Sequence, residues 1–145
     1  MTFIDENAFY ECKSLEYVKL PASLEEAGWR CFQDCDKLTT IVMPEGITTN
    51  FGQWFFLSCD SLTNIDFHTA PIIGFSMYQD CDNLTVLNIP DCVTTIDMQA
   101  FAYCDQLSYV TIPAGVTDFG AKVFYECPKL KVIAFRGDAP AFHEF

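Results

Sequence analysis

"VTTIDMQAFAYCDQLSYVTIP" spans residues 93–113, and its pattern recurs along nearly the whole chain. Its cysteine is one of six, here called the ladder cysteines, that are separated by 23, 24, 22, 23 and 23 residues: Cys12, Cys35, Cys59, Cys81, Cys104 and Cys127. An aromatic residue stands three positions before each of them: Phe9, Phe32, Phe56, Tyr78, Phe101 and Phe124. Leucine stands three positions after each of them: Leu15, Leu38, Leu62, Leu84, Leu107 and Leu130. A fixed period of this length indicates a solenoid whose repeats stack on one another.

The half of each repeat that follows the ladder cysteine has the pattern of a β-strand. Apolar residues stand six and eight positions after the cysteine, as Val110 and Ile112 do in the fifth repeat. Side chains alternate across a strand, so these two positions face the core and positions plus five and plus seven face solvent. Proline at plus nine, as in Pro113, then ends the strand because it has no N–H to donate to a sheet.

The half that precedes the cysteine has a helical rhythm. Ile96, Ala100 and Cys104 follow one another at intervals of four, with Asp97 placed as a helix cap. Four glycines take the place of Asp97 in other repeats and predict a tight turn there: Gly28, Gly52, Gly74 and Gly120. The sequence therefore predicts an α/β fold, a right-handed leucine-rich repeat solenoid of six repeats of about 23 residues, each with a strand and a short helix.

Two stretches, "AFYECKSLEYVKLP" (8–21) and residues 93–113, resemble the BspA-like leucine-rich repeats of bacterial and protozoal surface proteins. The resemblance implies a secreted or cell-surface interaction protein that adheres to a host surface protein, a matrix protein or a glycan. It implies no cofactor. The third repeat departs from the pattern, because His68 replaces the proline and "FGQWFF" (51–56) is unusually aromatic.

The length and ends of the chain predict one repeat domain over residues 1–145, cut from a longer protein. Its first repeat begins in the second half of the pattern, and "FRGDAPAFHEF" (135–145) resembles the start of a further repeat. No apolar run approaches the roughly 20 residues that a membrane span requires. Residues 1–6 lack the basic start and apolar stretch of a secretory signal.

The net charge of −12 excludes two partner classes. Nucleic acids and anionic membranes require basic patches, and eight lysines and arginines spread over six repeats cannot form one. The acidic surface is consistent with a cationic partner, and it is equally what solubility alone would favour.

The cysteines are expected to be free thiols. Equivalent residues in stacked strands lie about 4.8 Å apart with parallel side chains, whereas a disulfide needs its Cβ atoms about 3.8 Å apart. Cys31 and Cys92 belong to different repeats and should not meet. Zinc is disfavoured: Cys31 and Cys35 are four positions apart, but a structural site needs four converging ligands, and the chain has no C-x-x-C motif and only His68 and His143 to assist.

Acidic residues provide one weak metal hypothesis. The position after the ladder cysteine is aspartate in four consecutive repeats: Asp36, Asp60, Asp82 and Asp105. Stacked carboxylates repel one another, and Ca²⁺ could relieve that repulsion. Alternatively, each aspartate accepts a hydrogen bond from the main chain in an Asx turn.

Catalysis is not expected. His68 lies near Asp66 in the sequence, but no nucleophile elbow or glycine-rich loop accompanies them. The chain is therefore predicted to be a non-enzymatic protein-interaction module, or alternatively a structural stalk that presents another domain.

The outward-facing strand positions form the candidate binding surface. They are Tyr17, Lys19, Thr40, Val42, Asn64, Asp66, Val86, Asn88, Tyr109 and Thr111, followed by Val132 and Ala134. Tyrosines provide a large contact area at a low entropic cost, although an ordinary solvated sheet would use similar residues. A second candidate surface surrounds Phe51, Trp54 and Phe55, where core packing is the competing interpretation.

Overall fold

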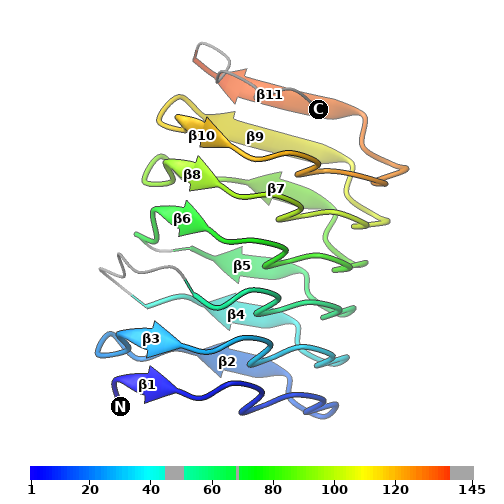
Figure 1. The fold of residues 1–145 in the computed structure, drawn as a ribbon. Coiled ribbons are helices and arrows are strands. Elements are labelled where there is room, and N and C mark those ends of the chain that lie inside the picture. Colours follow the sequence, from blue (N-terminus) through cyan, green and yellow to red (C-terminus); the bar gives the residue numbers. More distant parts are fainter. Residues whose placement is uncertain (45–50, 68, 138–145) are drawn as a thin grey trace.

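The chain coils into a β-solenoid of about 6 turns, with one turn for each repeat of the sequence (Figure 1). The computed structural model describes residues 1–44, 51–67 and 69–137. His68 and His143, which entered the zinc and catalytic arguments, lie outside the described residues. Every strand pair among the described residues is parallel, because each turn of the coil runs in the same direction as the one before it.

The longer strands form one side of the solenoid, which we call the ladder face. They are β2 (Tyr17–Lys19), β4 (Thr40–Val42), β5 (Asn64–Asp66), β7 (Val86–Asn88), β9 (Tyr109–Pro113) and β11 (Val132–Arg136). They pair at equivalent repeat positions in two sheets, of order β2-β4-β5 and β7-β9-β11. Ile41 and Leu87 point into the core while their neighbours point outward, so the predicted strand register is confirmed.

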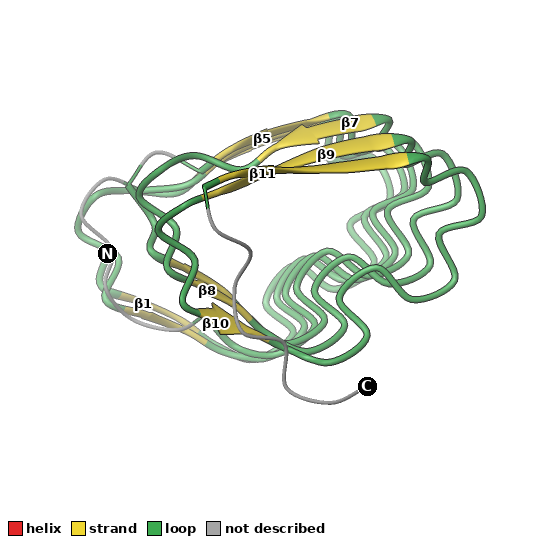
Figure 2. Ribbon diagram, turned by 90° about the horizontal axis from the view of Figure 1, so that it is seen from above, coloured by secondary structure: helices red, strands yellow, loops and turns green. Residues whose placement is uncertain are grey.

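Five two-residue strands form the opposite side, here the short-strand face (Figure 2). They are β1 (Phe3–Ile4), β3 (Glu26–Ala27), β6 (Ile72–Ile73), β8 (Thr95–Ile96) and β10 (Asp118–Phe119). The second residue of each strand is buried, as Ile4 and Ile96 illustrate. The short strands also form two sheets, β1-β3 and β6-β8-β10, so the core lies between the parallel sheets of the ladder face and those of the short-strand face.

The prediction of a short helix in each repeat is wrong. No helix occurs among the described residues, and residues 97–104 form successive turns. Gln99 and Tyr103 have φ values of 58° and 60°, which are left-handed and incompatible with an α-helix. Both N–H groups donate to the next repeat, Gln99 to the Ala121 carbonyl at 3.1 Å and Tyr103 to the Tyr125 carbonyl at 2.8 Å. Between them, the Phe101 N–H also donates to the next repeat, whereas the Ala102 N–H closes a local turn to the Gln99 carbonyl at 3.1 Å. A helix would instead keep all these bonds within one repeat.

The same two left-handed positions occur in every repeat. They are Asn7 and Glu11, Arg30 and Asp34, Trp54 and Ser58, Ser76 and Asp80, Gln99 and Tyr103, and Lys122 and Glu126. Isolated left-handed residues cost about 1–2 kcal/mol each. In the first five repeats the cost is offset, because each such residue donates its N–H to a carbonyl of the next repeat and so extends a hydrogen-bonded ladder along the molecule.

The glycines that precede these turns allow adjacent repeats to approach closely. A Cβ atom on Gly52 would lie 2.3 Å from the carbonyl oxygen of Gly28, and one on Gly120 would lie 2.3 Å from the main-chain nitrogen of Met98. Neither glycine has a positive φ. The physical reason for glycine here is therefore the lack of space between repeats, and not the special turn conformation that the sequence suggested.

Aromatic rings stack along the solenoid, and those of the four middle repeats are buried in the core. Phe9 and Phe32 lie with centroids 4.9 Å apart and planes at 6°, and Tyr78 and Phe101 at 5.4 Å and 11°. The stack continues through the other equivalent residues, Phe56 and Phe124. Stacked rings fill the interior with large apolar area and favour one register between repeats.

The ladder cysteines are free, and five of them donate hydrogen bonds between repeats. The Cys59 thiol donates to the Phe32 carbonyl at 3.2 Å, and the Cys104 thiol donates to the Tyr78 carbonyl at 3.3 Å. The others do the same with the aromatic residue of the preceding repeat: Cys35, Cys81 and Cys127. Burial raises the pKa of Cys35 to about 11 and raises the pKa of Cys59 further. These thiols are therefore small core residues with a donor, and they are poor nucleophiles at neutral pH.

Replacing Ile112 by aspartate should lower the free energy of unfolding by more than about 3 kcal/mol, because an unpaired charge would enter a fully buried position. Thr111→Asp, one residue away on the ladder face, should cost less than about 1 kcal/mol. Urea denaturation of both variants tests this register. Equal losses for the two would contradict it.

Replacing Gly120 by alanine should destabilise the protein by about 2 kcal/mol or more, because the new methyl group would overlap the backbone at Met98. Gly115→Ala is the matched control, since its Cβ atom would lie 3.3 Å from its nearest neighbour, the Asp91 carbonyl oxygen. Melting temperatures of the two variants distinguish close approach between repeats from a general intolerance of alanine at glycine positions.

A thiolate-specific reagent at pH 8 should react slowly with Cys35, Cys59 and Cys81 in the folded protein, because their raised pKa values leave little thiolate. The partly exposed Cys12, Cys92 and Cys127 should react first. Denaturation without reductant should release all eight thiols of the chain. Disulfides between ladder cysteines in a mass spectrum of the purified protein would contradict the free-thiol structure.

Candidate functional site

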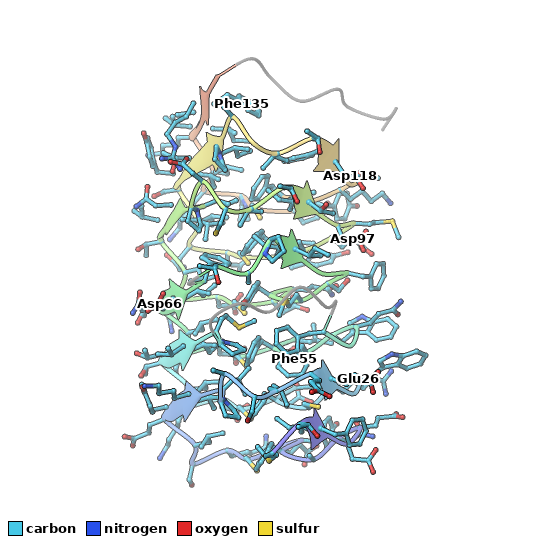
Figure 3. The ribbon with its side chains drawn as sticks, turned by 90° about the vertical axis from the view of Figure 1, so that its left-hand side faces the viewer. Glu26, Phe55, Asp66, Asp97, Asp118 and Phe135 are labelled. Atoms are coloured by element: carbon cyan, nitrogen blue, oxygen red, sulfur yellow. The ribbon has the colours of Figure 1, made fainter. Side chains whose placement is uncertain are left out.

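The outward-facing residues of the ladder face lie where the sequence placed them. Tyr17 is 54% exposed and Tyr109 is 38% exposed, and both stand at the same position of their repeats. Asp66 marks this side of the solenoid in Figure 3, opposite Glu26. Lys19, Asn64, Val86 and Asn88 are also exposed, whereas Thr40, Val42 and Thr111 are half-buried. The predicted surface therefore exists as one face of the solenoid.

The strand pairing brings these residues together in two groups. Tyr17 pairs with Thr40 and then Asn64, and Val86 pairs with Tyr109 and then Val132. The two tyrosines belong to different sheets and lie four repeats apart, or about 19 Å at the usual spacing of strands. The face is thus long enough to contact an extended partner and presents one tyrosine toward each end.

Small polar side chains between the tyrosines satisfy their own hydrogen bonds. The Thr111 hydroxyl donates to the Asn88 side-chain oxygen at 3.1 Å. At the edge of the face, the Thr39 hydroxyl donates to the Glu16 carbonyl at 3.1 Å and the Ser108 hydroxyl to the Thr85 carbonyl at 3.0 Å. These contacts order the surface, and they present neither an activated nucleophile nor an acid–base pair.

The aspartates after the ladder cysteines occupy tight turns on another edge of the coil. Main-chain bonds close these turns, as the Leu38 N–H does to the Cys35 carbonyl at 3.0 Å. The Lys13 ammonium pairs with Asp36 at 3.2 Å. Burial, and then the charges of Asp82 and Asp36, raise the pKa of Asp60. No three metal-binding side chains converge among the described residues.

Of the three aromatic residues in the second candidate surface, the structure buries two and leaves one at the surface. Phe55 and Phe51 are buried in the core, in agreement with the packing interpretation. Trp54 lies at the surface, where its ring meets Phe75 edge-on at 5.3 Å and the Arg30 guanidinium lies 5.3 Å from its centre. Only the tryptophan therefore remains a candidate for binding on this side.

Trp29 is an exposed aromatic residue that the sequence analysis missed. It is 53% exposed and contacts Trp54 edge-on at 6.4 Å. Trp29 stands six positions before its ladder cysteine, where the other repeats carry Glu6, Gln53, Phe75, Met98 and Ala121. Comparison of this position across the repeats would have indicated an outward-facing row that is partly aromatic.

The described part of the chain contains no helix that is long and apolar enough to span a bilayer. None of the curated proteins matches the sequence.

Two solved structures are similar in both sequence and fold. A leucine rich cell surface protein from Faecalibacterium prausnitzii A2-165 is 28% identical with a TM-score of 0.78, and the match covers 86% of this chain and 33% of that one. The leucine-rich repeat protein of T. pallidum is 25% identical with a TM-score of 0.65, over 90% of this chain and 72% of that one. This chain thus spans about a third of the length of the cell-surface protein.

A third structure, the pneumococcal vaccine antigen PcpA, is 19% identical with a TM-score of 0.71, over 89% of this chain and 32% of that one, and it shows the fold alone. The family model described as the BspA type leucine rich repeat region matches residues 1–72 and 71–144. Because these two matches cover almost the whole sequence, the chain belongs to the BspA type leucine-rich repeat family.

Proposed function

We propose that this protein is a non-enzymatic interaction module that binds a protein through the ladder face. The observation that supports this proposal is the exposure of Tyr17 and Tyr109 at equivalent positions of one face. Neither ring is needed to fill the core, which the stacked aromatic residues already occupy. Exposed tyrosines surrounded by ordered small polar groups are typical of surfaces that bind proteins.

The proposed contact surface comprises the outward-facing residues of the ladder face. They are Tyr17, Lys19, Thr40, Val42, Asn64, Asp66, Val86, Asn88, Tyr109 and Thr111. The face extends over about 24 Å from β2 to β11 at the usual strand spacing. A long surface of this kind suits an extended protein segment better than a small molecule, which requires a concave pocket.

The cell-surface description of the F. prausnitzii protein supports an extracellular or cell-surface location for this chain. In that setting, residues 1–145 would act as one domain that contacts a host surface protein, a matrix protein or a glycan. Adhesion is the function that such contacts would serve.

A structural stalk is the alternative function, and one observation favours it. Adjacent repeats are joined by three main-chain bonds in the turn region, for example from Arg30, Phe32 and Asp34 to the next repeat, and by ring stacking in the core. A coil connected in this way is stiff along its axis and could hold another domain away from a surface. A stalk would show no partner in a broad binding screen against matrix proteins.

Replacing Tyr17 and Tyr109 by alanine should weaken binding of a captured matrix protein by more than about 1 kcal/mol for each substitution, because aromatic anchors dominate interface energies. The affinities can be measured by surface plasmon resonance with the immobilised partner. The melting temperature should remain nearly unchanged, since both side chains point away from the core.

Tyr10→Ala provides a matched control. Tyr10 is 41% exposed, but it lies in the turn region, away from the strands of the ladder face. Its loss should leave the affinity unchanged. A partner that binds the double variant as tightly as the parent protein would contradict the ladder face as the contact surface.

A further inference from the structure

A recess of about 370 Å³ lies on the short-strand face, at the first three repeats. Phe3 from β1, Glu26 from β3, and Trp29 and Gln53 from the following turns form its walls. Its volume is near the lower limit of ligand pockets, and it therefore suits a single side chain better than a large ligand.

Two glycines form the floor of the recess. Gly28 and Gly52 lie so close together that a Cβ atom on Gly52 would be 2.3 Å from the Gly28 carbonyl oxygen. Because neither residue has a side chain, the main chain itself lies at the bottom and the neighbouring side chains stand around it. The recess is therefore a consequence of the close approach between repeats.

Two exposed aromatic rings border this floor. Phe3 is 51% exposed and Trp29 is 53% exposed, although the core of the same repeats is closely packed. Two large apolar side chains that share one recess and remain half in water form a surface that a ligand could cover favourably. Their π-faces attract cations as well as apolar groups.

The charge of the surroundings is negative. Glu26 is exposed at the recess, and within the described part of the chain its carboxylate has no ion pair or hydrogen-bond partner. Asp5, Glu6 and Glu25 are adjacent in the two strand segments, and no lysine or arginine lines the recess. A cation that entered would therefore meet an aromatic surface and an unpaired carboxylate together.

The same row of aromatic residues already binds a cation within the molecule. The Arg30 guanidinium lies 5.3 Å from the centre of the Trp54 ring, one repeat beyond Trp29. Trp29 presents a second indole beside it, edge-on at 6.4 Å. This contact is direct structural support for cation–π binding at this surface.

We propose that this recess binds the cationic side chain of an arginine or lysine from a basic segment of another protein. The cation would lie against Trp29 and Phe3 and pair with the Glu26 carboxylate, while the Gln53 side chain borders the entrance. This site is separate from the ladder face, since Glu26 and Asp66 point to opposite sides of the solenoid (Figure 3). The proposal does not depend on the ladder face being a binding surface.

The test uses a fluorescein-labelled tri-arginine peptide and the same peptide with citrulline in place of arginine. Citrulline has nearly the same shape as arginine but no charge. Fluorescence anisotropy should show that the protein binds the arginine peptide and binds the citrulline peptide at least about fivefold more weakly. Binding should also weaken as salt concentration rises, because salt screens the contribution of Glu26.

Two substitutions address the recess itself. Trp29→Ala and Glu26→Gln should each weaken binding of the arginine peptide by about fivefold, through loss of the aromatic surface and of the charge respectively. Both side chains are exposed, and circular dichroism should therefore show an unchanged fold and melting temperature.

Asp118→Asn is the matched control for charge. Asp118 occupies in β10 the position that Glu26 occupies in β3, and both project from the same face (Figure 3). Its repeat has Ala121 where the second repeat has Trp29. This variant should bind the arginine peptide as the parent protein does.

Three outcomes would overturn the proposal. The first is no detectable binding of the arginine peptide, and the second is equal binding of the citrulline peptide. The third is an equal loss of affinity in Glu26→Gln and Asp118→Asn, which would assign the attraction to the overall negative charge of the protein. If Trp29→Ala proved unstable, comparison of the peptide affinities of Glu26→Gln and Asp118→Asn would decide the question alone.

Discussion

The structure depends on the hydrogen bonds that pass from the turn residues of one repeat to the next. In the fifth repeat they run from Gln99, Phe101 and Tyr103 to the carbonyls of the sixth, and the left-handed φ values at Gln99 and Tyr103 allow the chain to direct them outward from its own turn. This arrangement fixes the distance and register between repeats. Stacking of the core rings, donation by the ladder thiols and the pairing of the long strands all require that register. Rings and strands join equivalent residues of adjacent repeats, and each thiol reaches the aromatic residue of the preceding repeat.

The period, the family resemblance and the division of the strand residues into inner and outer positions could all be predicted from the sequence, because burial repeats with the same spacing as the apolar residues. The backbone conformation of the turn region could not be predicted in this way. Ile96, Ala100 and Cys104 are indeed buried together, as a helix would place them. Hydrophobic spacing reports which side chains face the core and does not report where the N–H groups point. Gln99 and Tyr103 are also residue types with no strong preference for left-handed φ, so nothing in one repeat considered alone reveals the turn.

The physical reason for the glycines could not be predicted from the sequence either. A glycine before a turn suggests a special backbone conformation, yet Gly28, Gly52 and Gly120 are required because a neighbouring repeat occupies the space of a Cβ atom. That neighbour is about 23 residues away in the sequence, so local reasoning could not identify it. Trp29 was missed for a related reason: its significance comes from the recess that Gly28 and Gly52 create beside it, and from Glu26 on the adjacent strand.

The two candidate surfaces lie on opposite sides of one closely packed core. Phe55 lies between the face that carries Asp66 and the face that carries Glu26 (Figure 3), and it is fully buried. Exposed side chains on either face contribute little to this core, and substitutions there should leave the repeat register intact. The partners proposed for the ladder face and for the recess would therefore not compete for the same side chains, and a change at Tyr17 or at Trp29 should report on one surface without disturbing the other. Because the repeats share one backbone arrangement, the character of each surface is set mainly by its outward-facing residues, and substitutions there should cost the fold little.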